Sequence, residues 1–208
     1  MSRYLPVFPL GAVLLPAQAL PLHIFEDRYR QLMDLLTAGG SSGEMGVVLI
    51  ERGYEVGGGD VRVSTGTVAH LIEAERLPDG RWAAIFVGSH VFRVERWLPD
   101  DPFPQAMVEE LAEEDWDGRD GDVLSVAEAT VREALNLAAE LDTTTGTAAF
   151  TLSADPARAS WELCARAPLG PFDRQRLLEA PTRRDRLSLL AELAGDAARL
   201  LAFRLRGG

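Results

Sequence analysis

Residues 9–36, PLGAVLLPAQALPLHIFEDRYRQLMDLL, join extended segments to a helix, and the interpretation of the whole chain starts from them. Pro16 and Pro21 bound a short extended segment, because proline fixes φ and disfavours helix in the residue before it. Apolar side chains then recur at spacings of three and four, which places them on one helical face: Phe25, Tyr29, Leu32, Met33 and Leu36. The stretch therefore predicts an extended arm that enters a helix through a proline-defined corner.

The order of residues in this stretch is specific. A strand before residue 10, VLLP at 13–16 and LPLHIFEDRYRQLM at 20–33 together resemble the opening of the substrate-binding N-terminal domain of Lon proteases, a fold also found as free-standing proteins. The usual pattern of that family has glycine where Ala17 stands and proline where Asp27 stands. We expect neither difference to disrupt the fold. Ala17 only restricts φ relative to glycine, and Asp27 is acceptable in a first helical turn.

Composition and charge narrow the class of protein. Of the 208 residues, 47% are hydrophobic and 25% charged, as is typical of a soluble globular protein with one large or two small domains. The formal net charge is −11, and all 21 basic residues are arginine. Nucleic-acid-binding proteins gain affinity by neutralising phosphates with basic clusters. The acidic balance therefore argues against a general nucleic-acid partner.

Cysteine usage and hydropathy bear on location. Cys164 is the only cysteine, so no intramolecular disulfide can form, which fits a reducing compartment. The N-terminus lacks the pattern of a signal peptide, and no apolar run reaches the ~18 residues of a membrane span. We therefore expect a cytoplasmic protein with no membrane partner.

The part of the chain up to residue 115 is predicted to be β-rich with one helix. Strand-length apolar or alternating runs are separated by turn residues, and they lie at 45–50, 61–65, 67–72, 82–87, 91–98 and 105–111. The alternation changes phase at Gly66, which suggests a β-bulge or a sharp bend, as in a small closed barrel. Residues 66–94 also resemble the Lon N-terminal domain, and this resemblance implies a PUA-like pseudo-barrel.

The remainder is predicted to be helical. Residues 113–122 are acidic and turn-rich, so we place a linker at 116–122 between a barrel domain, 1–115, and a helical domain, 123–208. Ser125 and Glu128 could form a capping box for the first helix. Later helices begin at Asp155-Pro156, Gly170-Pro171 and Thr182. Residues 167–194 again resemble the Lon domain. The expected class is α+β, a PUA-like β pseudo-barrel with one helix followed by an α-helical bundle.

The sequence offers little catalytic chemistry. Without lysine there is neither a GxxxxGK[ST] phosphate loop nor a serine–lysine dyad. His23, His70, His90 and Cys164 lack the spacing of metal ligands, and Cys164 falls on an apolar helix face where an inert thiol is common. Acidic runs at 109–115 are expected to be solvated surface. We expect no cofactor, no metal site and no enzymatic activity.

A binding surface remains as the candidate site. Protein-recognition sites expose apolar and aromatic groups within a polar rim. One set of candidates is formed by aromatic residues that the strand pattern does not place inside: Trp97, Phe103, Trp116 and Tyr54. A second set lies near the barrel opening if the arm folds over it, with plain core packing as the alternative: Phe8, Leu22, Phe25 and Tyr29.

Three functions stay open from the sequence. The resemblance implies a non-catalytic module that binds unfolded or hydrophobic polypeptide segments, with a separate protease or chaperone as a further partner. The similarity of Lon N-terminal barrels to PUA barrels implies a small-ligand or RNA-binding alternative. A hydrolase is the third hypothesis, and it requires Cys164 or a serine hydrogen-bonded to a histidine in an open cleft.

Overall fold

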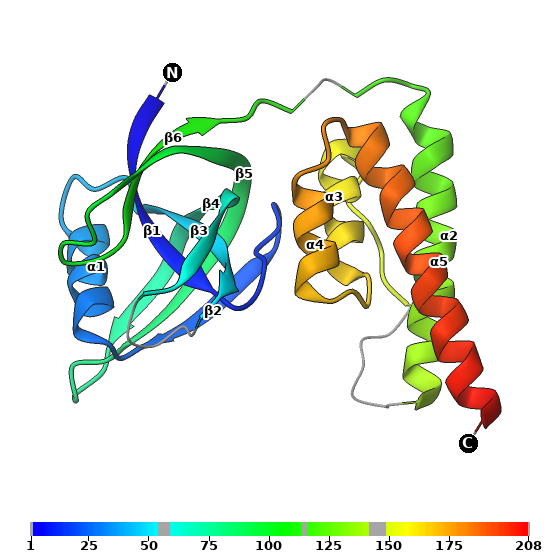
Figure 1. Ribbon diagram of the computed structural model, residues 1–208, viewed down its shortest axis with the longest axis horizontal. Helices are drawn as coiled ribbons and strands as arrows, with labels where there is room; N and C mark the ends of the chain where they lie inside the picture. Colours follow the sequence, from blue (N-terminus) through cyan, green and yellow to red (C-terminus); the bar gives the residue numbers. More distant parts are fainter. Residues whose placement is uncertain (1, 54–58, 114–115, 142–148, 208) are drawn as a thin grey trace. The chain divides into compact units, whose positions relative to one another are not determined.

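The computed structural model describes residues 2–53, 59–113, 116–141 and 149–207, and the chain divides into two compact units, Met1–Ala112 and Glu113–Gly208. The described strands and one helix belong to the first unit, in the order β1 (Ser2–Leu10), β2 (Ala19–Ile24), α1 (Asp27–Thr37), β3 (Glu44–Arg52), β4 (Val61–Arg76), β5 (Trp82–Leu98) and β6 (Gln105–Glu110) (Figure 1). The second unit contains α2 (Asp120–Leu141), α3 (Pro156–Arg166), α4 (Pro171–Leu178) and α5 (Arg183–Gly207). The predicted α+β class is confirmed. The predicted domain limits remain a proposal about which residues fold independently.

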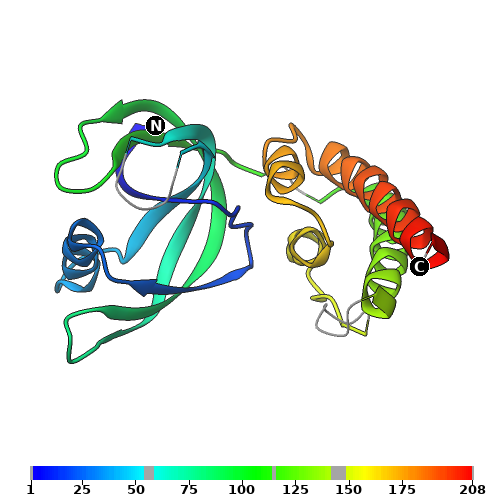
Figure 2. The same ribbon diagram turned by 60° about the horizontal axis from the view of Figure 1, so that its bottom comes forward.

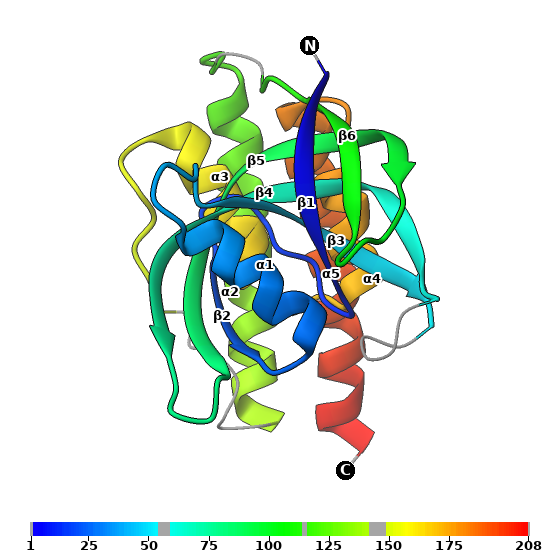
Figure 3. The ribbon, with the colours of Figure 1, turned by 90° about the vertical axis from the view of Figure 1, so that its left-hand side faces the viewer.

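The six described strands form one mixed sheet in the order β2-β5-β4-β3-β1-β6. The pair β1–β3 is parallel and the others are antiparallel. Because β5 also pairs with β6, the strands β1, β3, β4, β5 and β6 close into a ring. Within the part of the chain that the structure describes, β2 pairs only with the first half of β5 and lies outside this ring as an edge strand. Figures 2 and 3 show α1 on one side of the unit.

The helix α1 closes one side of the barrel core. Its residues Tyr29, Leu32, Met33 and Leu36 are all buried, as their spacing predicts. Phe25 was predicted on the same face, and this is wrong: its side chain is 54% exposed. The helix begins only at Asp27, so Phe25 lies before it and helical periodicity does not apply to it.

Helix starts in the second unit follow the sequence signals with one exception. The Asp155 side chain accepts a hydrogen bond from the Ala157 N–H at 3.1 Å, and Thr182 Oγ1 accepts one from the Asp185 N–H at 3.0 Å. The predicted capping box is wrong, because α2 already begins at Asp120 and the Ser125 hydroxyl donates to the Gly121 carbonyl within the helix.

The acidic run at 113–115 was predicted to be solvated surface, and Glu113 is exposed as predicted, but its carboxylate is also paired. Its carboxylate accepts a hydrogen bond from Trp161 Nε1 at 3.0 Å and pairs with Arg186. It also lies 3.5 Å from the guanidinium of Arg183. Both arginines come from α5 and are buried. The pairing of Glu113 therefore depends on cations that arrive about 70 residues later in the chain.

Close packing explains the phase change at Gly66. A Cβ atom at Gly66 would lie 2.4 Å from the Val47 carbonyl oxygen and 2.7 Å from Cζ of Phe92. The register of β3 with β4 shifts between the pairs Val48↔Gly66 and Ile50↔Arg62, so the predicted irregularity at this glycine is confirmed. The runs 82–87 and 91–98 prove to be one strand, β5.

Replacement of Gly66 by alanine should destabilise the protein by about 2 kcal/mol or more, because the clash involves a backbone carbonyl that cannot rotate away. Urea denaturation would measure the change. Gly195→Ala in α5 is the control. Its new Cβ would meet Thr130 Cγ2 at 3.6 Å, an ordinary contact, so a gain of about 0.5–1 kcal/mol is expected. A Gly66→Ala variant as stable as the wild type would contradict this account.

Ala17, where the sequence pattern suggests glycine, has φ of +64° and is the only non-glycine at positive φ among the described residues. Its N–H donates to the Gly88 carbonyl at 2.8 Å, which holds the turn in place. Left-handed backbone costs a residue with a Cβ about 1–2 kcal/mol. Ala17→Gly should therefore stabilise the protein by about 0.5–1 kcal/mol after the added entropy of the unfolded chain is subtracted. Thermal unfolding would test this.

The matched control is Ala12→Gly, in the same connection but without a positive φ. The free energy of unfolding of this variant is expected to fall by about 0.5 kcal/mol, because glycine there only adds entropy to the unfolded chain. Equal shifts in the two variants would show that the backbone at Ala17 is unstrained.

Candidate functional site

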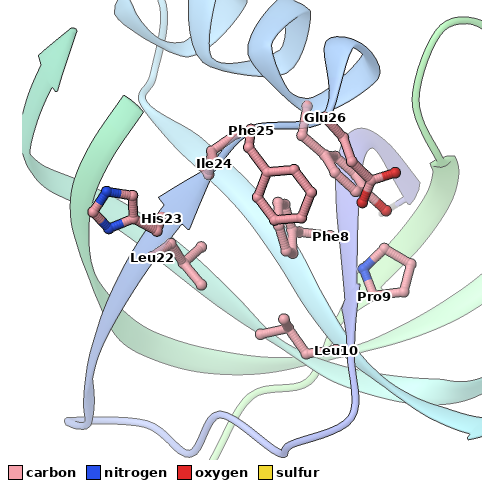
Figure 4. Close-up of a pocket in the computed structure, with 9 residues that line it drawn as sticks. Phe8, Pro9, Leu10, Leu22, His23, Ile24, Phe25 and Glu26 are labelled. Carbon is pink, nitrogen blue, oxygen red and sulfur yellow. The ribbon is translucent and has the colours of Figure 1, made fainter. Parts of the chain in front are cut away.

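A pocket of about 130 Å³ lies between the end of β1, the strand β2 and the start of α1 (Figure 4). Its walls are mainly apolar, formed by Phe8, Leu10, Leu22, Ile24 and Phe25. In Figure 4 the side chains of Leu22, Phe25 and Leu10 lie in the space between the two strands, while His23 points to the other side of β2. This opposite direction of neighbouring residues is the normal alternation of a strand.

The floor of the pocket is aromatic. The rings of Phe8 and Tyr29 are in contact, with centroids 4.2 Å apart and planes inclined by 33°. The guanidinium of Arg28 lies 4.4 Å from the Tyr29 ring centroid, and its Nε is 3.2 Å from a carboxylate oxygen of Glu26. Burial raises the pKa of Tyr29, so its phenol stays neutral at physiological pH. The floor is therefore an uncharged aromatic surface with one carboxylate, Glu26, at its rim.

A second, more open depression of about 370 Å³ lies on the β2-β5-β4 part of the sheet. Pro21, Ala83 and Ile85 provide apolar surface, and Glu73 and Glu75 provide carboxylates. This depression shares Leu22 and His23 with the first pocket, so both adjoin the edge strand β2.

Four of the predicted binding residues line the first pocket: Phe8, Leu22, Phe25 and Tyr29. Phe8 and Tyr29 are buried, at 8% and 3% exposure, and belong to the hydrophobic core as well as to the pocket floor. Leu22 is half-buried, and Phe25 is exposed. Accessible apolar surface is therefore offered mainly by Phe25 and Leu22.

The structure does not bring the other candidates to this pocket. Phe103 is buried at 6% exposure in the core cluster that contains Phe8. Trp97 is half-buried beside Arg62, whose guanidinium lies 5.2 Å from its ring and pairs with Asp60 and Asp100.

Two further candidates were Trp116 and Tyr54, and Trp116 is not among the residues that line the pocket. Trp116 belongs to the second unit, where the Arg183 guanidinium lies 5.3 Å from its ring centroid. Tyr54 lies outside the described residues.

Several pocket residues were not anticipated, namely Leu10, Ile24 and Glu26, as were the depression residues Glu73, Glu75 and Ile85. The first three belong to the quoted arm and could have been included with it. The others come together only through the register of β2 with β5 and of β5 with β4.

One serine–histidine contact bears on the hydrolase hypothesis. Ser89 Oγ lies 2.9 Å from His90 Nδ1, and His90 Nε2 lies 3.2 Å from a carboxylate oxygen of Glu110. The Ser89 hydroxyl, however, donates to the Val68 carbonyl at 3.0 Å. Neither Ser89 nor His90 lines either pocket. Neither of these two pockets therefore gives the contact the open cleft that a nucleophile requires.

Metal and thiol chemistry find no support in the described residues. In that part of the chain no three histidine, cysteine, aspartate or glutamate side chains are placed to hold a metal ion. Cys164 is fully buried, and burial raises the pKa of its thiol to about 11. No helix within the described ranges combines the length and apolar character needed to cross a membrane.

Comparison with known proteins identifies two Lon proteases as relatives of this chain. The chain is 26% identical over 151 residues to a Lon protease of Flavobacterium johnsoniae. The matched region covers 71% of this chain and 18% of that protein. It is 30% identical over 131 residues to Lon protease 2 of Desulfotalea psychrophila, covering 62% and 16%. The chain thus spans less than a fifth of the length of these curated relatives.

Two solved structures cover nearly the whole chain. The crystal structure of a Lon N-terminal domain protein from Xanthomonas campestris matches with a TM-score of 0.65 and 26% identity, over 91% of this chain and 98% of that one. The N-terminal domain of a Mycobacterium avium complex Lon protease matches with a TM-score of 0.66 and 18% identity, over 93% and 99%, and shows the shared fold.

The family pattern described as the ATP-dependent protease La (LON) substrate-binding domain matches residues 4–195, which include both units almost completely. The chain therefore belongs to the family of Lon substrate-binding domains.

Proposed function

We propose that the protein is a non-catalytic module that binds unfolded or hydrophobic polypeptide segments through the pocket between β1 and β2. The observation that carries the proposal is the exposed side chain of Phe25, 54% accessible, beside a preformed apolar pocket. A folded protein gains nothing from leaving an aromatic ring in water next to an apolar cavity. Membership of the Lon substrate-binding family supports the same function.

The size of the pocket favours a side chain of a polypeptide as the ligand. Sites for small organic ligands commonly measure about 300–1,000 Å³. The pocket beside Phe25 has a volume of about 130 Å³, which suits one apolar side chain. Burial of about 200 Å² of apolar surface would contribute roughly 5 kcal/mol before the entropy of ordering is subtracted. Binding is therefore expected to be weak; a Kd on the order of 100 μM corresponds to about −5.5 kcal/mol and needs contacts outside the pocket as well.

The charges around the two pockets disfavour RNA. Neither pocket has an arginine among its lining residues, whereas Glu26, Glu73 and Glu75 line one or the other. Phosphates would be repelled by these carboxylates. We therefore do not retain RNA as the ligand of this surface.

A separate protease or chaperone is the further partner that we propose. The curated relatives are Lon proteases, and this chain corresponds to less than a fifth of their length. Lysine is absent from the chain, so the phosphate loop and the serine–lysine dyad would have to come from elsewhere. In this proposal the module captures an exposed apolar segment and the partner acts on it.

The test is binding of a fluorescein-labelled, reduced and carboxymethylated polypeptide, measured by fluorescence anisotropy. Phe25→Ser should weaken binding about tenfold, because it removes the accessible aromatic surface beside the pocket. The fold should be unaffected, since the ring is mostly solvated, and circular dichroism would check this.

Phe172→Ser is the matched control, because Phe172 is 63% exposed on α4 in the second unit. It should bind as the wild type does. Equal losses in the two variants would mean that binding is non-specific. Absence of binding by the wild type at ~100 μM would remove the proposed function altogether.

A further inference from the structure

The strand β2 has one unpaired edge. Among the described residues it pairs with β5 alone. The Gly88 N–H donates to the Gln18 carbonyl at 2.9 Å, which makes Gln18 and Gly88 a bonded position of the antiparallel pair. Backbone groups then alternate, so those of Pro21 and His23 are directed away from β5. The free edge of β2 therefore offers the carbonyl groups of Pro21 and His23 and the N–H group of His23.

The end of β1 presents a similar edge on the other side of the pocket. The Val7 N–H donates to the Pro104 carbonyl at 2.8 Å, on the side of β1 that faces away from β3. By alternation the carbonyl of Pro9, which lines the pocket, lies on that same outer side. Pro9 and Pro21 have no N–H, so at these positions the two edges offer only acceptors. A strand that adds to β2 must therefore donate an N–H group to the Pro21 carbonyl, whereas pairing with the end of β1 is not required.

The charge beside this edge is negative. The strand register aligns Pro21 with Ile85 and Glu73, and His23 with Ala83 and Glu75, in two rows across the sheet. Glu73 and Glu75 make no ion pair within the described ranges of the chain. They lie two strand spacings from β2 and three from an added strand, roughly 14 Å, which exceeds the ~8 Å Debye length at physiological ionic strength. A long basic side chain of the added strand that reaches back over the sheet would bring its charge close enough to be attracted.

We propose that the bound segment adds to the free edge of β2 as an extended strand, with an apolar side chain in the pocket beside Phe25 and basic side chains over the depression that contains Glu73 and Glu75. This inference rests on the proposed function and specifies its substrate class. The unpaired backbone acceptors require a ligand with free N–H groups in extended conformation. A helix has no such groups along its length, because they are paired internally.

The carboxylates of Glu73 and Glu75 disfavour the binding of negatively charged strands. A second copy of this chain carries a net charge of −11 and would be repelled, as would an acidic segment. Proline at both edges also limits indiscriminate pairing, which is a common protection of exposed strands. The structure thus favours an apolar segment that alternates with basic residues.

The first test uses a synthetic nine-residue peptide that alternates arginine with valine around a central phenylalanine. Two derivatives carry N-methyl groups on the odd or on the even residues, which removes the N–H groups of one edge or the other. Strand addition predicts that one derivative loses affinity at least tenfold while the other stays within threefold of the parent. Equal retention or equal loss in both would overturn strand addition.

The second test concerns charge. Glu73→Gln with Glu75→Gln should weaken the arginine peptide threefold to fivefold, and should leave a peptide with glutamine in place of arginine unchanged. The control is Glu133→Gln with Glu140→Gln on α2, where both side chains are exposed and the change in net charge is the same. The proposed preference for basic segments would be overturned if the control variant weakened binding equally. It would also be overturned if the Glu73→Gln, Glu75→Gln variant bound the arginine peptide as the wild type does.

The experiments distinguish failure of the proposed function from failure of the inferred substrate class. If the carboxymethylated polypeptide binds through Phe25 but the nine-residue peptide does not, the proposed function stands and the substrate class is wrong. If neither ligand binds, both fall together.

Discussion

The barrel of the first unit depends on the space around Phe92. This ring is fully buried, and Gly46 on β3 and Gly66 on β4 are packed directly against it. A Cβ at either glycine would lie 2.7 Å from the ring, so only glycine allows the three strands to approach as they do. With Phe92 in place, β5 can pair with β4 and β6 at once and close the ring. The position of β2, which lies outside the ring, depends on this closure because β2 pairs with β5.

The length of β5 determines where the candidate site lies. Its second half closes the ring with β6, and its first half extends beyond the ring and carries β2 as an additional strand. The arm before β2 turns at Ala17 and the strand runs directly into α1. The connection to α1 leaves Phe25 between the two elements, where neither the sheet nor the helix buries it. An unpaired edge and an exposed aromatic ring are thus two results of the same geometry.

The second unit is organised by paired buried charges. Arg183 and Arg186 on α5 are buried, and Glu113 from the start of the unit pairs with both. The Arg186 guanidinium also lies 3.5 Å from the ring centroid of Trp161 on α3. Buried cations cost free energy unless they are paired, so this cluster ties the first residues of the unit to its last helix. Glu113 is exposed, as its acidic neighbours indicated, but its pairing was not anticipated because its partners are distant in the chain.

The sequence by itself determined the fold class, the strand order along the chain, the helix caps at Asp155 and Thr182, and the family to which the chain belongs, because these depend on local periodicity, capping and residue order. It also singled out the arm that forms the pocket. Only the tertiary structure decided that Phe103 is core, that Phe25 is accessible and that Glu73 and Glu75 lie in register with the edge strand. Burial and register arise from contacts between residues far apart in the chain, and periodicity within one segment carries no information about them.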